Sequence, residues 1–308
     1  MIQMLMCISD SFFENNSKKI KGGKEMRRTD IAIESLNITK NNIGEASGIP
    51  GVLIDYEEKD DYLVTKLSVR SREGAEKTGK PEGEYVTIDA PGVKYDNSCL
   101  EAVSHEIAKQ IRRIGSLKKD NVILVVGLGN REITPDALGC DVVSKIIITN
   151  HIKKQSPEIL SEGMRAVCAI APGVLGTTGM ESLEITKGVS EKLKPDIIIV
   201  IDALAAGEFS RVSTTFQISD AGIAPGSGVG NNRDSFSEES LGVKVIAIGV
   251  PTVVDAKSIC DCEIEGEPMM VTPRDIDLVI KRCAKTVALG INLALHEGFS
   301  VKDIEELS

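Results

Sequence analysis

Apolar and polar positions alternate in one part of this chain and form continuous runs in another. Between about residues 41 and 94, the stretches GVLIDYEE, YLVTKLSVR and YVTIDAPG are bounded by glycine and proline, which is typical of antiparallel strands. Further along, NVILVVGLGN, PDIIIVIDAL, VKVIAIGVP and MRAVCAIAPG are apolar runs that indicate strands buried on both faces of a parallel sheet. The pattern predicts a β-rich N-terminal portion followed by a parallel sheet.

Stretches in which apolar residues recur at helical spacing lie between these predicted strands. SCLEAVSHEIAKQIRRIGSL predicts a helix from about Ser98 to Ile114, and further helices are expected near residues 136–150, 180–194 and 273–296. Alternating strands and helices predict an α/β fold with a mostly parallel central sheet flanked by helices. With 42% hydrophobic residues, residues 31–308 are expected to form a single domain.

Charge and cysteine content narrow the classes of function. The net charge of −10 disfavours direct binding to nucleic acid. Seven cysteines, an odd number, indicate free thiols in a reducing compartment. Because no signal peptide and no membrane-spanning run is recognisable, we expect a cytoplasmic protein that does not bind membranes. Cys260 and Cys262 form the only close cysteine pair, and without a second pair or a nearby histidine they predict no metal; no cofactor is expected.

Two aspartates stand at the ends of predicted strands. Asp136 follows the run that ends in GLGN, and Asp202 directly follows the run Ile197 to Ile201. Ligands gather at the carboxyl ends of strands in open α/β sheets, so the fold can bring these side chains together. Two neighbouring carboxylates suit peptide hydrolysis, because they resist ionising together and leave one acid and one base.

Simpler interpretations of both aspartates remain open at this stage. Asp136 can be a residue of a helix start capped by Thr134, and Asp202 can accept hydrogen bonds from a glycine-rich turn. A nucleotide- or phosphate-binding module that uses the glycine-rich loops APGVLGTTGMES and DAGIAPGSGVGNNR is the main alternative function, although both lack the G-K-S/T of a P-loop. The three histidines, His105, His151 and His296, are expected to be surface or satisfied residues.

Several long blocks of sequence resemble the spore germination protease family. They are VVGLGNREITPDALG, APGVLGTTGMES and DALAAGEFSRVSTTFQISDAGIAPGSGVGNNR, with RTDIAIES before them and GVPTVVDA and MMVTPRDIDLVI after them. The resemblance implies an atypical aspartic endopeptidase that degrades small acid-soluble spore proteins during germination, with a sheet like that of hydrogenase-maturation proteases. It places the two catalytic aspartates of the family on Asp136 and Asp202, without a metal. A metal-dependent maturation protease is the third alternative.

The resemblance also implies a homotetrameric zymogen of the forespore and spore core that cuts itself once. Its substrates are cut after an acidic residue in a motif close to Thr-Glu-Phe/Ile-Ala-Ser/Gly-Glu. The stretch Thr29, Asp30, Ile31, Ala32, Ile33, Glu34 matches this motif, with a larger Ile33 in place of the small residue. The expected self-cleavage therefore lies between Asp30 and Ile31, with Thr29, Ala32 and Glu34 recognised, and residues 1–30 form a pro-segment.

The first 25 residues are unlike the rest of the chain. KGGKEM can be encoded by a ribosome-binding sequence a few nucleotides before the Met26 codon. Two interpretations stay open: either residues 1–25 are an untranslated leader and synthesis begins at Met26, or they belong to a longer pro-segment.

Overall fold

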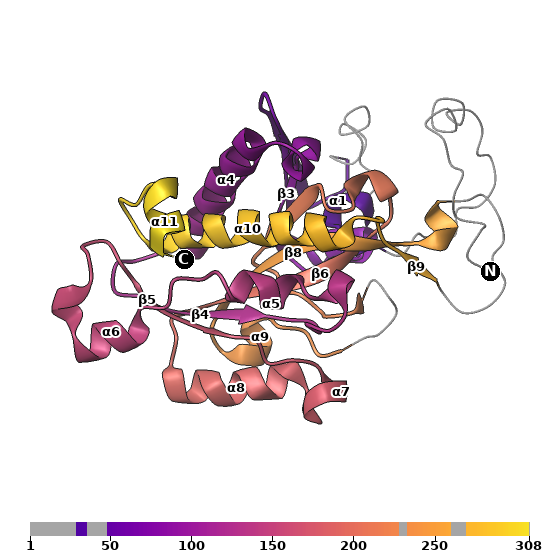
Figure 1. Cartoon of the computed structure of the whole chain (residues 1–308). Coiled ribbons are helices and arrows are strands. Elements are labelled where there is room, and N and C mark those ends of the chain that lie inside the picture. The colour runs from indigo at the N-terminus through magenta and orange to yellow at the C-terminus, as the bar shows by residue number, and fades with distance from the viewer. Residues whose placement is uncertain (1–28, 36–47, 228–232, 260–268, 308) are drawn as a thin grey trace.

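The structure, a computed structural model, describes residues 29–35, 48–227, 233–259 and 269–307. Several predictions concern residues outside these ranges. They are the leader and the translation start, nearly all of the proposed pro-segment, and the Cys260/Cys262 pair. Within them, nine strands form one sheet in the order β1-β2-β3-β7-β8-β6-β4-β5, and β9 pairs with β8 (Figure 1). The strands are β1 Val52–Glu58, β2 Leu63–Val69, β3 Gly83–Asp89, β4 Val122–Gly127, β5 Ala166–Ile170, β6 Ile197–Ala206, β7 Thr215–Ser219, β8 Lys244–Asp255 and β9 Met270–Val271.

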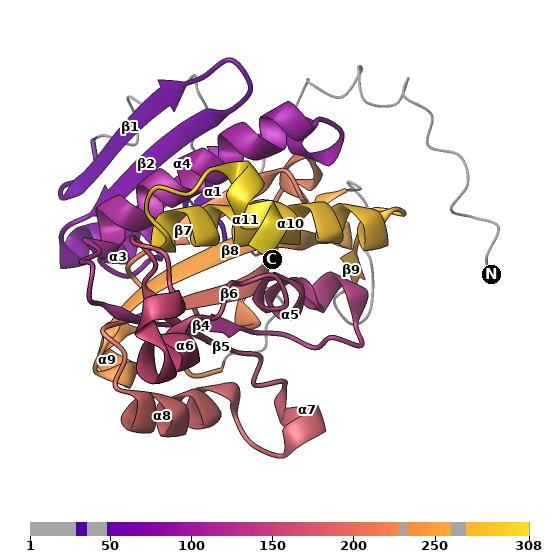
Figure 2. The ribbon, with the colours of Figure 1, turned by 60° about the vertical axis from the view of Figure 1, so that its left-hand side comes forward.

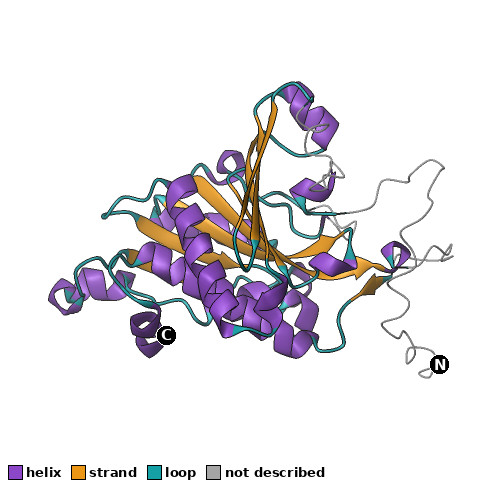
Figure 3. Cartoon of the chain, turned by 90° about the horizontal axis from the view of Figure 1, so that it is seen from above, coloured by secondary structure: helices purple, strands orange, loops and turns teal. Residues whose placement is uncertain are grey.

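The sheet joins a parallel part to an antiparallel part. The strands β8, β6, β4 and β5 are parallel neighbours, and they are the four that the apolar runs predicted. The three N-terminal strands are antiparallel and extend the same sheet through β7, so the predicted β-rich portion is an extension of the sheet (Figure 3). The α/β fold is confirmed, and the short strand β7 is the element that the sequence pattern missed.

Helices cover both faces of the parallel part (Figures 1 and 2). On one face, α4, α5 and α10 bury alternate strand residues such as Val125, Ile199 and Ile248 in the largest apolar core. On the other face, α8 and α9 pack against the intervening residues, including Leu124, Ile198 and Val245. Because helices cover both faces, residues that point to either face are apolar, and the sequence of each strand is a continuous apolar run.

The helix predictions hold for three of the four stretches. The α-helices are α1 Ala32–Ser35, α3 Arg72–Thr78, α4 Asn97–Gly115, α5 Leu138–Val143, α6 Asn150–Gln155, α7 Leu175–Thr178, α8 Ser182–Leu193, α9 Glu238–Leu241, α10 Ile276–Leu295 and α11 Val301–Leu307. The 3-10 turns are η3 Pro91–Lys94, η4 Thr134–Asp136, η5 Pro157–Ile159, η6 Phe209–Arg211 and η8 Ala256–Ser258. The helix predicted near 136–150 is much shorter than expected, since that stretch holds the end of η4, the six-residue α5 and the start of α6.

Candidate active site

The loop after β4 carries Asp136 back over the end of its own strand. Gly129 has a φ of +102°, and a Cβ there would lie 1.9 Å from the main-chain oxygen of Asp136, so only glycine permits this close approach. The Asn130 N–H donates a hydrogen bond of 2.7 Å to the Asp136 carboxylate. The loop thus holds one carboxylate at the carboxyl end of β4.

Asp136 does lie in a helical turn just before α5, but the cap expected from Thr134 was wrong. Asp136 is the last residue of η4, and neither η4 nor α5 has a side-chain cap. Its carboxylate bonds the loop before it, at Asn130, and not the free amides of a following helix.

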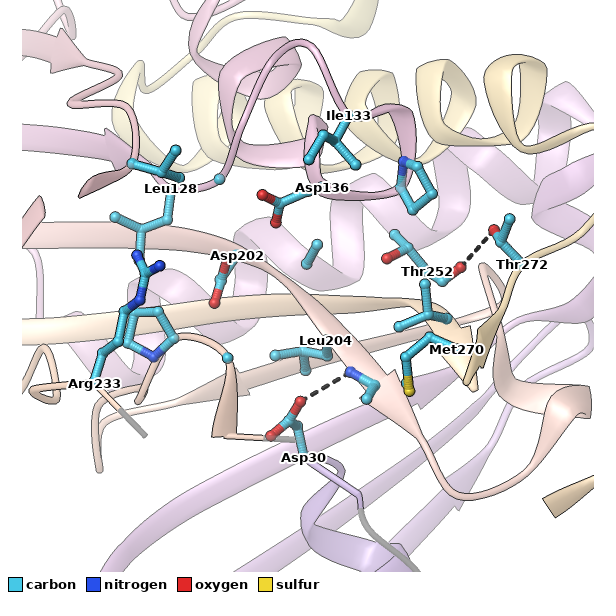
Figure 4. A pocket seen from close by; sticks show the side chains of 18 of the residues that line it. Asp30, Leu128, Ile133, Asp136, Asp202, Leu204, Arg233, Thr252, Met270 and Thr272 are labelled. Atoms are coloured by element: carbon cyan, nitrogen blue, oxygen red, sulfur yellow. Dashed lines mark hydrogen bonds between the residues drawn. The ribbon is translucent and has the colours of Figure 1, made fainter. Parts of the chain in front are cut away.

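Asp202 belongs to β6 and lies one residue beyond Ile201, the last residue of β6 that pairs with β4. Its side chain and that of Asp136 project into the same space (Figure 4). This space is a cavity of about 420 Å³. Its lining includes Asp30, Asp136, Asp202, Leu204, Ala205, Arg233 and Thr252. The two aspartates that sequence reasoning placed at strand ends therefore share one site.

Burial and mutual repulsion set the protonation of the two carboxyl groups. Asp202 is only 4% exposed, and burial raises its pKa well above the usual value, with the charges of Asp136 and Asp30 raising it further. Burial also raises the pKa of Asp136, but the Asn130 N–H and the charge of Arg233 oppose this. Asp202 therefore holds a proton more firmly than Asp136, whose carboxylate form is stabilised by the Asn130 N–H and by Arg233.

A third carboxylate enters the cavity from the predicted self-cleavage segment. The Asp30 carboxylate accepts hydrogen bonds from the Ala205 N–H at 2.9 Å and from the Ser227 hydroxyl at 2.5 Å. The Asp30 N–H in turn donates to the Ala205 carbonyl oxygen at 3.0 Å. Three acidic side chains line this cavity, and they disfavour the phosphate-binding alternative, because the negative charge of Asp30 and Asp136 would repel a bound phosphate.

The free edge of β6 explains why Asp30 binds there. The ladder with β4 ends at Gly127 and Ile201, while β6 continues to Ala206. The Ile201 carbonyl points towards β4, because it accepts a hydrogen bond of 2.8 Å from the Leu128 N–H. In a strand, main-chain groups four residues apart point to the same side, so the N–H and carbonyl of Ala205 point to this side as well. Asp30 therefore pairs with β6 where β4 has ended.

The residues after Asp30 are also held closely. Ile31 and Ile33 are buried with Leu204, and the Ala32 N–H donates to the side chain of Gln217 at 2.7 Å. The Glu34 carboxylate accepts hydrogen bonds from the N–H groups of Gly207 at 2.7 Å and Glu208 at 3.1 Å.

Charged and hydroxyl groups complete the binding of Glu34. Arg211 lies 3.4 Å from the Glu34 carboxylate, and the Thr29 hydroxyl donates to it. Burial nonetheless raises the Glu34 pKa. Of the five residues predicted for cleavage and recognition, Asp30 lines the cavity of the two aspartates, and Thr29, Ile31, Ala32 and Glu34 are held next to it on the protein.

Sequence reasoning missed the residues that hold this segment. They are Lys80, Arg211, Gln217 and Ser227, and Arg233, which lines the cavity near Asp136 and Asp202, was missed as well. A local signal existed only for Ser227 and Arg233, which lie in the glycine-rich stretch DAGIAPGSGVGNNR. Val174 and Ser182 of the other glycine-rich stretch also line the cavity, as expected if these loops shape a peptide cleft.

Comparison with known proteins decides the family. A family model described as "Germination protease" matches residues 28–266. The chain belongs to the germination protease family. It is 42% identical to the germination protease of Caldanaerobacter subterraneus subsp. tengcongensis, over 91% of this chain and 97% of that protein. It is 41% identical to that of Clostridium perfringens strain ATCC 13124, over 91% of this chain and 98% of that protein.

Among solved structures, the chain is similar to the [NiFe] hydrogenase maturation protease HycI from Thermococcus kodakarensis KOD1. The identity is 19% and the TM-score 0.35, covering 60% of this chain and 98% of that chain.

The three histidines do not line the cavity. His105 and His151 are exposed, as predicted, whereas His296 is buried, and burial lowers its pKa to about 4. In the described ranges, no three or more His, Cys, Asp or Glu side chains are grouped so that they could hold a metal ion. None of the helices in these ranges is long and apolar enough to cross a membrane.

Proposed function

We propose that this protein is an aspartic-type endopeptidase that cuts its own chain between Asp30 and Ile31 and cuts other proteins after acidic residues. The observation that carries the proposal is the position of Asp30, whose carboxylate lies in the same cavity as Asp136 and Asp202. A peptide segment that matches the expected cleavage motif is thus bound beside two carboxyl groups suited to hydrolysis.

The electrostatics of the pair support a division of roles. Asp136, ionised and stabilised by the Asn130 N–H, takes a proton from a water molecule as the general base. Asp202, buried and protonated, supplies a proton as the general acid, to the carbonyl oxygen or to the leaving nitrogen. The water oxygen bonds to the carbonyl carbon, the bond to Ile31 breaks, and a new carboxyl group and a new amine result.

Family membership supports the substrates and the setting that we propose. They are small acid-soluble spore proteins degraded during germination, by an enzyme made as a self-processing homotetrameric zymogen in the forespore and spore core. Light scattering of the purified chain measures the tetramer, and a monomer at all concentrations would contradict it.

Self-processing of the purified full chain tests the proposal. We expect mass spectrometry to find a product that begins at Ile31, and the variants Asp136→Asn and Asp202→Asn to stop its formation while circular dichroism stays unchanged. The exposed Asp120→Asn is the matched control and should process normally. A metal-dependent enzyme would instead lose activity with a chelator and recover it with added metal.

A further inference from the structure

The main-chain carbonyl of Asp30 is held by two side-chain donors, one from the connection between α3 and β3 and one from strand β7. Lys80, just after α3, places its Nζ 3.0 Å from this carbonyl oxygen, and Gln217 on β7 places its Nε2 at 3.3 Å. Lys80 also lies 3.4 Å from the carbonyl oxygen of Thr29. The carbonyl that receives both donors belongs to the peptide bond at which self-cleavage is proposed.

The two donors are fixed by contacts of their own. Gln217 is buried on β7, and its Oε1 is occupied by the Ala32 N–H at 2.7 Å, which turns its amide NH₂ towards Asp30. Lys80 is partly buried. Burial lowers its pKa, while the carboxylates of Asp30 and Glu34 oppose this and favour the ammonium form. Donors that are preorganised in this way lose little energy in reorganising during a reaction.

We propose that Lys80 and Gln217 are further catalytic residues that stabilise the oxyanion formed on the Asp30 carbonyl oxygen during self-cleavage. This inference rests on the proposed function. When water oxygen bonds to the carbonyl carbon, the π electrons move to the carbonyl oxygen, which gains a negative charge. An ammonium group at hydrogen-bond distance stabilises that charge more than it stabilises the neutral carbonyl.

With the oxyanion stabilised in this way, the proton of Asp202 goes to the leaving nitrogen. Since Lys80 and Gln217 stabilise the oxygen, the intermediate collapses when Asp202 protonates the leaving nitrogen of Ile31. The electrons of the oxyanion reform the carbonyl, the C–N bond breaks, and the proton taken from water stays on Asp136. Ile31 leaves as an amine, and Asp30 ends as the new carboxyl terminus.

The experiment compares the first-order rates of self-processing of the full chain with Lys80→Ala and with Lys77→Ala. Lys77 lies on the neighbouring helix α3, is exposed and pairs with Glu73 at 2.8 Å, so it is a matched control. Removing one oxyanion donor typically costs 10²- to 10³-fold in rate, so we expect about a 100-fold loss for Lys80→Ala and none for Lys77→Ala. Propylammonium, added to fill the space of the lost side chain, should restore part of the rate.

A second measurement separates catalysis from anchoring. Hydrogen exchange of the Asp30 and Ala32 amides, which are bonded to Ala205 and Gln217, reports whether residues 29–35 stay bound. Slow processing with unchanged exchange supports an oxyanion role. An unchanged or faster rate in Lys80→Ala, or a loss matched by faster exchange and not restored by the amine, would overturn it. If the parent chain makes no product beginning at Ile31, the proposed function fails as well.

Discussion

Asp30 and Ala205 exchange two hydrogen bonds, one through the main chain of Asp30 and one through its carboxylate. The Asp30 N–H donates to the Ala205 carbonyl, and the Ala205 N–H donates to the Asp30 side chain. An edge strand normally offers its N–H groups to main-chain carbonyls. Here the carboxylate of Asp30 accepts the hydrogen bond from the Ala205 N–H. Position 30 therefore favours a residue whose side-chain oxygen can reach this N–H.

Replacing Asp30 should therefore stop self-processing. Asp30→Ala leaves the Ala205 N–H and the Ser227 hydroxyl without their acceptor, and we expect at least a 100-fold slower appearance of the product, measured by intact mass. Asp30→Glu keeps a carboxylate and should retain processing. Unimpeded processing of Asp30→Ala would contradict the assignment of the cleavage site.

Releasing Glu34 should loosen the bound segment. Glu34→Gln removes the charge that faces Arg211 and the N–H groups of Gly207 and Glu208. Charge-assisted hydrogen bonds contribute roughly 1.5–3 kcal/mol, so we expect hydrogen exchange at Asp30 and Ala32 to rise at least tenfold. The exposed Glu239→Gln should leave this exchange unchanged, and equal exchange in both variants would contradict the role of Glu34.

The rate of peptide cleavage should pass through a maximum as pH rises. Activity needs Asp136 ionised and Asp202 protonated, so it increases through the pKa of Asp136 and decreases through that of Asp202. Both values are raised above the reference of 3.8. The charge of Arg233 lowers both, so Arg233→Gln should move the whole profile to higher pH, and the exposed Arg274→Gln should not. A profile of Arg233→Gln that moved to lower pH would contradict these roles.

Asp202→Asn should increase stability near neutral pH. Because the folded-state pKa of Asp202 is raised, the folded chain holds a proton that the unfolded chain has released, and stability falls as pH rises from the unfolded pKa towards the folded pKa. Removing this group should therefore raise the free energy of unfolding at pH 7.

Urea denaturation of the parent and of Asp202→Asn at several pH values measures this difference. The gain should shrink as pH falls towards 3.8, the reference value for the unfolded group. If Asp202→Asn is only as stable as the parent at pH 7, the buried carboxyl of Asp202 does not lower the free energy of unfolding, and the prediction is wrong.

Gly129→Ala should abolish activity at a moderate cost in stability. The added Cβ meets the main-chain oxygen of Asp136 and forces a positive φ on alanine, so the loop must move and take the carboxylate with it. We expect more than a 100-fold loss in rate. Gly188→Ala in α8, where a Cβ meets nothing within 4 Å, should instead stabilise the fold by about 0.5–1 kcal/mol in urea denaturation. An active Gly129→Ala enzyme would show that the loop accommodates the added Cβ without displacing the Asp136 carboxylate, and would contradict the prediction.

The parallel strands and the meeting of Asp136 with Asp202 could be predicted because both depend on local pattern and on a general rule of α/β sheets. Doubly buried strands produce apolar runs, and strand ends converge. Strand β7 was not predicted because TFQIS is short and alternates three polar residues with only two apolar ones. The helix after Asp136 is shorter than predicted, because the main chain passes very close to Gly127, Gly129 and Gly139 where the loop packs against the strand end.

The donors around Asp30 could not be predicted, because their meeting depends on sheet order. Lys80 precedes β3 and Gln217 belongs to β7, and these strands become neighbours only through the antiparallel extension of the sheet. Arg211 reaches Glu34 from η6, beyond the end of β6. No spacing in the sequence encodes these contacts, although the motif around Asp30 marked the segment that they bind.

The bound segment changes its backbone conformation directly after the proposed cleavage point. Asp30 lies at a bend and exchanges two hydrogen bonds with Ala205, whereas α1 begins at Ala32, two residues later. A chain bound in the same way must bend at one residue and begin a helix almost at once. Long regular strands and uninterrupted helices cannot do both, so under the proposed function the backbone shape of a substrate, and not its acidic residue alone, determines where it is cut.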